Sequence, residues 1–532
     1  MRRVEILTPV QASELVHDGV TIIAATVGYT GHAESVLKNI EKRFLETGHP
    51  RDLTFMHPAG SQGPNRTGSV HLCHEGLVKR YIAAHWGNSP EWCELVGNNK
   101  VECYSFSQGT ISQMYRSSGS GQPGHLTKIG LGTFIDPRIE GGKMNPRTKE
   151  NGPDLVEVKE IDGEEYLFYK PIPVDFALIR GTYADEYGNI TMDDEAIRLE
   201  TLSAVLAAKH WGGKVVCQVK KIFKGGSFRP NEVVIPGCYV DYLVECDDIY
   251  NEHRMTAGTY FDPVLLGKYK YSDDRIPGIP VEMNIRKIIG RRAALEIKKH
   301  DMCNVGVGIP YDTISRTLYE EGIRKDVLFT VETGVFGGTL PNSFDFGAAY
   351  NFDAILDQTT MFDFYSGCGL DITFMGIGEV DPMGNGNASK MNGKAVGCGG
   401  FVDITQNARK VVFCTTFTAK GLKIDWDEEK GITILKEGSV KKFVNQIIQK
   451  TFSSEFARKA GQEIMWVTER AVFVMTDTGI KLTEIARGVD IQKDILDQME
   501  FVPEIADDLK VINPIIYRNG LIGMKDLLGC EE

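Results

Sequence analysis

The chain has 532 residues and a formal net charge of −13, with 42% hydrophobic and 25% charged residues, a composition typical of a folded globular protein. The acidic balance argues against nucleic acid or an anionic membrane as a partner, since both require clustered Lys and Arg. No stretch approaches 18 uninterrupted apolar residues, the N-terminus shows no signal-peptide pattern, and the eleven cysteines contain no Cys-x-x-Cys pair. We therefore expect a cytoplasmic protein with neither a membrane span nor a zinc ribbon.

Short β-branched runs alternate with amphipathic stretches along the chain, the pattern of open α/β domains with largely parallel sheets. A strand is predicted over residues 20–25, followed by a glycine turn over 28–31 and a helix over 36–44. The same order of strand, glycine turn and helix recurs over 304–322. The repetition suggests that two units of one kind follow each other.

A closer internal match supports this. Seven residues recur at one constant shift, which takes Asp175 to Asp371 and Lys214 to Lys410. The seven are Asp175, Asp185, Gly188, Asn189, Lys214, Val215 and Val216, which reappear as Asp371, Asp381, Gly384, Asn385, Lys410, Val411 and Val412. We infer two tandem homologous α/β domains, 1–280 and 281–532. The join is predicted in the Pro- and Gly-containing segment 270–284, before a helix over 285–299.

Histidine is confined to the part of the chain between His17 and His300. A Ser-His-Asp or Cys-His site built wholly from the second half is therefore excluded, although one formed across the halves is not. His71 and His74 resemble metal ligands only in isolation, because no second His/Cys cluster stands at ligand spacing. We expect structural roles for both.

The segment Val331-Glu332-Thr333-Gly334-Val335-Phe336-Gly337-Gly338 places one carboxylate between a predicted buried strand, 328–331, and a glycine-rich turn. Open α/β sheets bind ligands at the carboxyl ends of their strands. A glutamate in that place can attack a carbonyl as a nucleophile, while the small neighbours let a large substrate approach. The alternative is that Glu332 simply opens a loop.

The repeated Asp-x-x-Gly-Asn segments are expected to be turns, because Asp and Asn bond to nearby backbone groups. In the second copy Gly384, Gly386 and the nearby Lys390 are also candidates for contact with a phosphate-rich ligand. The several Gly-x-Gly elements make no complete nicotinamide fingerprint, since none opens a helix with an acidic residue at the required distance.

The segments "VETGVFGG", "SFSQGTIS" (105–112) and "GCGGFVDIT" (397–405) together resemble family I coenzyme A transferases. Longer stretches such as "GHLTKIGLGTFIDPRIEGGK" and "TERAVFVMTDTGIKLTEIARGVDIQKDIL" are similar to the single-chain acetate/propionate type, which is related to succinyl-CoA:3-ketoacid CoA-transferase. The resemblance covers nearly the whole chain. It implies the CoA-transferase fold and makes CoA the ligand for Gly384, Gly386 and Lys390.

The resemblance also assigns roles within the site. The family's nucleophile falls on Glu332, its Gln-Gly-Thr glutamine on Gln108, and its oxyanion loop on Gly399 and Gly400, without deciding which glycine donates. Two departures stand out. The ketoacid type has Ser-Glu-Asn-Gly where this chain has Val331-Glu332-Thr333-Gly334, and the family usually has Gly-Gly-Phe where this chain has Ala25-Thr26-Val27. The first favours short monocarboxylic acids over 3-oxoacids, and the second leaves the wall of the acyl or CoA pocket undefined.

The activity implied is ping-pong transfer of CoA from a short-chain acyl-CoA to a free carboxylate such as acetate or propionate. It proceeds through an acyl-glutamyl anhydride and a glutamyl-CoA thioester on Glu332, with CoA as substrate and transient adduct and no separate cofactor. Because the anhydride must be shielded from water, a cleft that closes between the halves is expected. The expected assembly is a homo-oligomer, either dimer or tetramer. Two alternatives are an acyl-CoA hydrolase that uses the same glutamate and a non-catalytic acyl-CoA or sugar-phosphate sensor.

Overall fold

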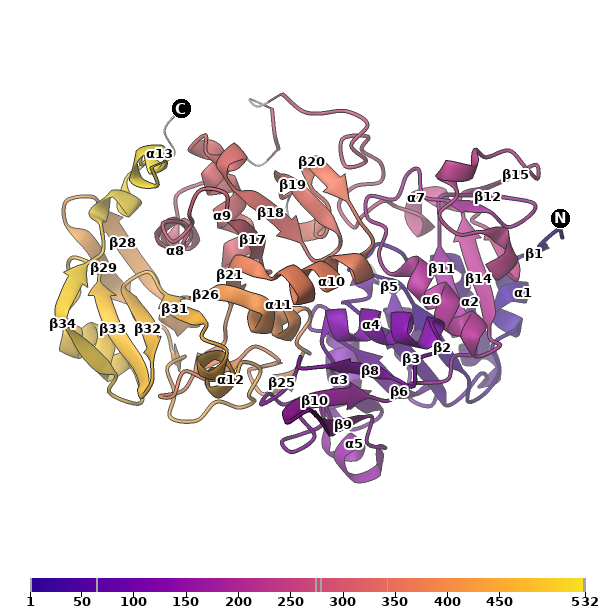
Figure 1. Ribbon diagram of the computed structural model, residues 1–532, viewed down its shortest axis with the longest axis horizontal. Coiled ribbons are helices and arrows are strands. Elements are labelled where there is room, and N and C mark those ends of the chain that lie inside the picture. The colour runs from indigo at the N-terminus through magenta and orange to yellow at the C-terminus, as the bar shows by residue number, and fades with distance from the viewer. Residues whose placement is uncertain (1, 64–65, 273–274, 278–279, 342, 530–532) are drawn as a thin grey trace.

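The computed structural model describes residues 2–63, 66–272, 275–277, 280–341 and 343–529. Two α/β halves lie side by side along the longest axis, and the two ends of the chain lie far apart (Figure 1). Each half is built on one large sheet. We call the part up to β16 the first half and the part from α8 onward the second half.

The sheet of the first half has eight strands, all parallel. Their order is β1 (Glu5–Leu7), β16 (Tyr242–Glu245), β14 (Lys214–Val219), β11 (Phe176–Arg180), β2 (Thr21–Ala24), β3 (Leu53–His57), β6 (Val78–Ala83) and β7 (Glu102–Tyr104). The central strands are apolar and buried on both faces, as parallel sheets covered by helices require.

The sheet of the second half has ten strands, with a parallel centre, antiparallel strands on both sides, and an edge strand β34 that pairs parallel with β33. Their order is β20 (Tyr350–Ile355), β19 (Val335–Thr339), β18 (Leu328–Val331), β17 (Met302–Val305), β21 (Leu370–Gly376), β26 (Ala408–Cys414), β31 (Glu463–Val467), β32 (Ala471–Thr476), β33 (Gly479–Ile485) and β34 (Glu504–Val511). The predicted fold class, tandem open α/β units with largely parallel sheets, is confirmed.

The internal sequence match is a repeat of strand register. In the first half Phe176 of β11 lies opposite Lys214 of β14, and in the second half Ile372 of β21 lies opposite Lys410 of β26. The two Asp-x-x-Gly-Asn turns also agree, because Asn189 donates to Asp185 at 3.0 Å and Asn385 to Asp381 at 2.9 Å. These turns have the local capping role expected of Asp and Asn.

Helices cover both sheets and meet between the halves. They are α1 (Pro9–Glu14), α2 (Glu34–Thr47), α3 (Pro90–Gly97), α4 (Gln108–Gly119), α5 (Pro146–Asn151), α6 (Thr201–His210), α7 (Ile249–Glu252), α8 (Ile285–Ala294), α9 (Ile309–Glu320), α10 (Gln358–Cys368), α11 (Phe401–Asn407), α12 (Ser454–Lys459) and α13 (Met524–Leu527). Helix α4 of the first half packs against α10 and α11 of the second (Figure 1).

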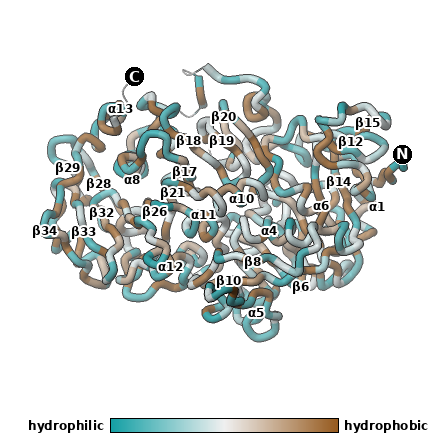
Figure 2. The backbone as a smooth tube through the Cα atoms, viewed as in Figure 1, coloured by the Kyte–Doolittle hydropathy of each residue, from teal (hydrophilic) through white to brown (hydrophobic). Residues whose placement is uncertain are grey.

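Shorter strands form hairpins and small sheets around the two large ones. They are β4 (Gln62–Gly63), β5 (Thr67–Gly68), β8 (His125–Thr127), β9 (Val156–Ile161), β10 (Glu164–Tyr169), β12 (Tyr183–Asp185), β13 (Ile190–Thr191), β15 (Lys221–Phe223), β22 (Glu379–Val380), β23 (Gly386–Asn387), β24 (Lys390–Met391), β25 (Lys394–Ala395), β27 (Thr418–Ala419), β28 (Lys423–Asp427), β29 (Gly431–Lys436) and β30 (Val440–Lys441). Figure 2 shows polar segments along much of the periphery, as around α5.

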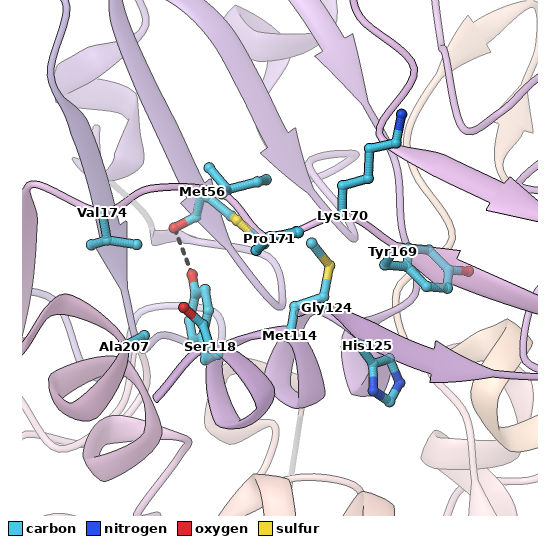
Figure 3. Close-up of a pocket in the computed structure, with 12 residues that line it drawn as sticks. Met56, Met114, Ser118, Gly124, His125, Tyr169, Lys170, Pro171, Val174 and Ala207 are labelled. Atoms are coloured by element: carbon cyan, nitrogen blue, oxygen red, sulfur yellow. Dashed lines mark hydrogen bonds between the residues drawn. The ribbon is translucent and has the colours of Figure 1, made fainter. Parts of the chain in front are cut away.

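Helix α4 is held firmly on the first sheet. The hydroxyl of Tyr115 donates to the carbonyl of Met56 at 2.9 Å, which ties the helix to the end of β3. Figure 3 shows Met114 and Ser118 of α4 facing Met56 and Pro171 across a cavity of about 10 Å³. A space of that size holds at most one water molecule, so it is not an acyl-CoA site.

One predicted helix is shorter in the structure, and the predicted domain boundary lies next to residues that the structure does not describe. The helix predicted over 285–299 ends at Ala294, because Ile297 turns into the apolar core and its N–H bonds to the carbonyl of Ala294, three residues back, in a turn that leaves the α-helix. The expected boundary at residue 280 stays a prediction, and Gly278 beside it lies outside the described residues. None of the helices in the described ranges is long and apolar enough to cross a membrane.

Candidate functional site

Glu332 directly follows β18, at the carboxyl end of a strand in the second sheet. It opens the turn 332–334 that joins β18 to β19 in a hairpin, with Val331 opposite Val335. Gly334 adopts a φ of +114°, and a Cβ there would lie 2.1 Å from the carbonyl oxygen of Leu356. Only glycine fits that close approach, so the turn that presents Glu332 depends on Gly334.

The rest of the glycine-rich segment is strand rather than turn, which corrects the sequence prediction. Gly337 and Gly338 lie within β19, both with positive φ, where the pairing with β20 shifts register between Phe336 and Gly337. One common type of bulge in an antiparallel strand places a glycine in the left-handed conformation, which glycine adopts without strain. Glycine was interpreted as a turn former, but here its conformational freedom serves a bulge.

The position of Glu332 is special to the second half. In the register shared by both halves, Cys303 pairs with Phe329 as Ile22 pairs with Phe55. Three residues after Phe329 comes Glu332, and three after Phe55 comes Pro58. The repeat therefore carries one carboxylate at this strand end, not two.

The Glu332 side chain is almost completely buried, at 6% exposure. Its Oε2 accepts from Nδ2 of Asn304, the residue before the end of β17, at 3.5 Å. Burial raises the pKa of Glu332 from its usual range to about 7; the Asn304 bond opposes this rise and the charge of Asp403 adds to it. No ion pair within the described ranges involves Glu332, an arrangement more typical of functional carboxylates than of structural ones.

Gln108 is the first residue of α4 and reaches the site from the first half. Its Nε2 donates to Oε1 of Gln358, the first residue of α10, at 3.0 Å. Gln358 in turn donates from Nε2 to Glu200 at 2.7 Å and to Ser112 at 3.1 Å. The amide of Gln108 is therefore fixed by a chain of buried polar groups that crosses between the halves.

The glycine loop lies directly beside Gln108. The carbonyl of Gly399 accepts the backbone N–H of Gln108 at 3.0 Å, and the N–H of Gly399 donates to Ala84 at 2.8 Å. A Cβ on Gly400 would lie 3.5 Å from Oε1 of Gln108. For the N–H of Gly400 no acceptor is recorded among the described residues, whereas that of Gly399 is already used.

Glu332 and this loop are connected through a few side chains. Nδ2 of Asn304 also lies 3.2 Å from the hydroxyl of Tyr365 on α10. The Tyr365 ring is 5.8 Å from that of Phe362, which lies against the backbone of Gly109 and Gly400. The structure thus brings Glu332, Gln108 and the 399–400 loop into one region between the halves.

The wall that the sequence left undefined is mostly apolar but contains one buried polar side chain, Thr26, whose hydroxyl has no hydrogen-bond partner among the described residues. Ala25 and Val27 are buried in the same cluster as Val331 and Val335, together with Leu199 of the first half. Thr333, one of the departures from the ketoacid pattern, donates its hydroxyl to the carbonyl of Gly347 at 2.5 Å. Apolar side chains of the first half therefore belong to the same core as the hairpin that presents Glu332.

The other candidates lie in separate surroundings. A Cβ on Gly384 would meet Trp466, and one on Gly386 would meet Ile377, so both glycines pack against core side chains. Nζ of Lys390 lies 3.8 Å from Oε2 of Glu140 in the first half, and burial lowers the pKa of Lys390. Contact between these three residues and CoA stays a prediction.

His71 and His74 pair with carboxylates. His71 lies between Glu34 and Glu41, and His74 contacts Glu41 at 2.7 Å. These two glutamates raise the pKa of His71 to about 9 against the effect of burial, so the imidazole is a cation at neutral pH. Both histidines thus join α2 to the segment after β5.

Three residues of the site were missed by the sequence analysis: Asn304, Gln358 and Asp403. Asn304 begins the segment 304–322, which was recognised as a strand, glycine turn and helix, and Asp403 lies within the quoted segment 397–405, so both stood beside a signal. Gln358 had none, because its partners Gln108 and Glu200 are distant in sequence.

A buried polar site between two α/β halves is typical of an enzyme that binds its substrate between domains. Comparison with known proteins agrees with this class. Residues 8–246 match the family model described as coenzyme A transferase. The chain is 41% identical to caffeate CoA-transferase of Acetobacterium woodii over 98% of both chains, and 39% identical to acetate CoA-transferase YdiF of Escherichia coli K12 over 98% of this chain and 96% of the relative.

The fold leads to the same family. The crystal structure of acyl-CoA transferase YdiF from E. coli O157:H7, in a thioester complex with CoA, superposes with a TM-score of 0.90 at 37% identity, covering 98% of this chain and 97% of the other. The chain therefore belongs to the coenzyme A transferase family and is a CoA-transferase. The resemblance noted in the sequence is confirmed.

Proposed function

We propose that the enzyme transfers CoA from a short-chain acyl-CoA to a free short-chain carboxylate such as acetate or propionate, with Glu332 as the nucleophile. One observation carries the proposal: Glu332 is a buried carboxylate at a strand's carboxyl end, with no ion-pair partner in the described part of the chain. Burial without a cation is costly for a structural residue, so a chemical role explains its position better. The names of the relatives, acetate and caffeate CoA-transferase, support the reaction type.

The cycle begins when ionised Glu332 attacks the thioester carbon of the acyl-CoA. The carbon–sulfur bond breaks, CoA leaves as a thiolate, and an acyl-glutamyl anhydride remains. The thiolate then attacks the glutamyl carbonyl and releases the first acid, which leaves a glutamyl-CoA thioester. A second carboxylate reverses both steps, and Glu332 is restored.

The raised pKa of Glu332 makes the first step less unfavourable. A carboxylate near pKa 4.3 would displace a thiolate whose thiol has a pKa near 8.5, a mismatch of roughly 4 units or about 6 kcal/mol. With the pKa of Glu332 at about 7, the mismatch falls to roughly 1.5 units, about 2 kcal/mol. Only about half of the carboxyl is ionised at pH 7, which is a small loss in comparison.

Two donors support the oxyanion in the proposed mechanism. Nε2 of Gln108 has two hydrogens, and Gln358 accepts one of them, which leaves the other for the substrate oxygen. The N–H of Gly400 is the second donor, since that of Gly399 already bonds to Ala84. Each such donor contributes on the order of 3 kcal/mol to transition-state stabilisation.

The wall supports small monocarboxylic acids as substrates. Ala25, Val27 and Leu199 are apolar, and Thr26 adds a single buried hydroxyl, so these residues offer no cation to pair with a second carboxylate. Low exposure of Glu332 also supports transfer over hydrolysis, because the anhydride would be shielded from water. Closure of the two halves on CoA, a dimeric or tetrameric assembly and a cytoplasmic location remain predictions.

Mass spectrometry tests the proposal directly. Incubation with acetyl-CoA and no acceptor acid should leave a CoA-sized mass on the peptide that contains Glu332, and Glu332→Ala should abolish both the adduct and turnover. Glu332→Asp should lose about 100-fold in activity, because the shorter arm displaces the oxygen by about 1 Å. Wild-type turnover in Glu332→Ala would contradict the assignment.

Adding an acceptor acid distinguishes a transferase from a hydrolase. A transferase should release free CoA slowly from acetyl-CoA alone and should form propionyl-CoA when propionate is added. A hydrolase would release CoA at the same rate with or without propionate.

A further inference from the structure

Asp403 is a buried carboxylate that the mechanism above does not use. It lies in the first turn of α11, three residues after Gly400, and is 2% exposed. Burial raises the pKa of Asp403 to about 6 against the hydrogen bonds it accepts. A buried carboxylate without a cation needs several donors to be stable, and here all the recorded donors belong to the opposite half.

The donors form the start of α4. Oδ2 of Asp403 accepts the N–H of Gly109 at 2.8 Å and the hydroxyl of Ser107, and Oδ1 accepts the N–H of Thr110 at 3.1 Å. The N–H of Asp403 donates back to the Ser107 hydroxyl at 3.1 Å. Ser107 precedes α4 but makes no capping bond of its own, so the N-terminal cap of this helix is supplied by the second half.

The two residues assigned to the oxyanion flank this contact. Gln108 lies between Ser107 and Gly109, both of which bond to Asp403, and Gly400 lies on the same turn as Asp403. The backbone bond from Gln108 to Gly399, at 3.0 Å, closes the arrangement. A shift of α4 relative to α11 would therefore separate the two donors.

We propose that Asp403 is the positioning residue that locks the first turn of α4 onto the 399–400 loop, so that Gln108 and Gly400 act on the same substrate oxygen. The inference rests on the proposed function, which assigns the oxyanion to those two residues. Asp403 itself touches neither substrate nor CoA in this role. It acts through the backbone of the helix that carries Gln108.

Asp403→Asn tests this role with a nearly isosteric change. In the variant, the side-chain NH2 group replaces one of the two carboxylate oxygens and cannot accept a hydrogen bond. About half of the bonds from the start of α4 are therefore lost, while the volume of the side chain is kept. We expect kcat to fall about 30-fold or more, with the KM for acetyl-CoA changed less than about threefold, because transition-state stabilisation is lost and ground-state binding is not. Asp490→Asn, which removes a cap far along the chain at Lys493, should leave kcat unchanged.

The pH dependence supplies a readout that loss of packing alone would not move. The negative charge of Asp403 raises the pKa of Glu332, and among the described residues Glu332 itself raises the pKa of the Tyr311 and Tyr365 hydroxyls. In Asp403→Asn the charge at position 403 is removed and the pKa of Glu332 should fall. The acid limb of the pH profile, where kcat/KM falls as Glu332 becomes protonated, should therefore move to lower pH. Ser107→Ala, which deletes one of the bonds and no charge, should lower kcat less and leave the limb in place.

The outcomes divide cleanly. If Asp403→Asn folds and keeps wild-type kcat, the positioning role is wrong even where Glu332 still forms the CoA adduct. If that variant does not fold, Ser107→Ala decides, and an unchanged kcat in it overturns the inference. Loss of the adduct in wild-type enzyme would instead remove the proposed function on which the inference rests.

Discussion

Nε2 of Gln108 in the first half donates to Oε1 of Gln358 in the second half at 3.0 Å, and both side chains are buried. Because Nε2 of Gln358 is committed to Glu200 and Ser112, its amide can present only oxygen to Gln108. The orientation of the proposed oxyanion donor is thus set by a residue 250 positions away.

Gln358→Met should therefore lower kcat by about 10- to 100-fold, because the amide of Gln108 loses the acceptor that fixes it and small displacements are costly in catalysis. Steady-state kinetics with acetyl-CoA and propionate measure the change, and KM should move much less. Gln218→Met is the matched control, since Gln218 is another buried glutamine bonded through both amide atoms, to Ser35 and Glu252, neither of which belongs to the second half. Equal losses of kcat in the two variants would show a general packing effect and contradict the role of Gln358.

The sequence was sufficient for the features that repeat or that follow local pattern. The internal repeat was found from Asp175, Lys214 and their copies, and the strand 328–331 before Glu332 was predicted to the residue. Both can be found by inspecting or comparing short segments of the sequence. The apolar alternation of parallel strands and the turn chemistry of Asp and Asn are local signals of this kind.

Contacts between the halves could not be derived in this way. The bonds of Gln358 and Asp403 join segments that periodicity treats as unrelated, and no local spacing records that α4 is capped by α11. The bulge at Gly337 was mistaken for a turn for a related reason. Glycine reports that an unusual φ is tolerated, but not whether a turn or a paired strand uses it.

Gly400→Pro should separate the two candidate glycines. The φ of Gly400 is −82°, close to the value that proline fixes, so the substitution removes the N–H without requiring a new φ at position 400. We expect kcat to fall by about 100- to 1,000-fold, as when one oxyanion donor is lost, whereas Gly400→Ala, which keeps the N–H, should lose much less. Stopped-flow measurement of glutamyl-CoA formation is the direct readout. Equal rates for the proline and alanine variants would exclude the Gly400 amide as a donor.

Activity should fall on the acid side of neutral pH. Burial raises the pKa of Glu332 to about 7, and the nucleophile must be ionised, so kcat/KM should drop about tenfold per pH unit below that value. Asn304 opposes the rise by donating to Glu332, so Asn304→Leu should move the limb to higher pH. Thr373→Val, which removes a hydroxyl beside Asn304 but no bond to Glu332, should leave it in place. If kcat/KM of the wild-type enzyme fell only below about pH 4.5, Glu332 would have an ordinary pKa and would not be desolvated.

The same pKa shift predicts that the nucleophile destabilises the folded enzyme at neutral pH. The folded-state pKa of Glu332, about 7, lies above the value of about 4.5 expected in the unfolded chain, so the folded state binds this proton more tightly. The stability that the protonated carboxyl provides is fully present below about pH 4.5 and is lost as the pH rises through 7. The difference of about 2.5 units corresponds to about 3 kcal/mol as an upper figure.

Glu332→Gln keeps the shape and carries no charge, so its free energy of unfolding should exceed that of the wild type at pH 8 and approach it at pH 5. Urea unfolding at the two pH values measures this, with the exposed Glu46→Gln as a control for the loss of one charge. If Glu332→Gln shows no gain at pH 8 relative to pH 5, ionised Glu332 is not held at an energetic cost, and the physical basis of its proposed reactivity is lost.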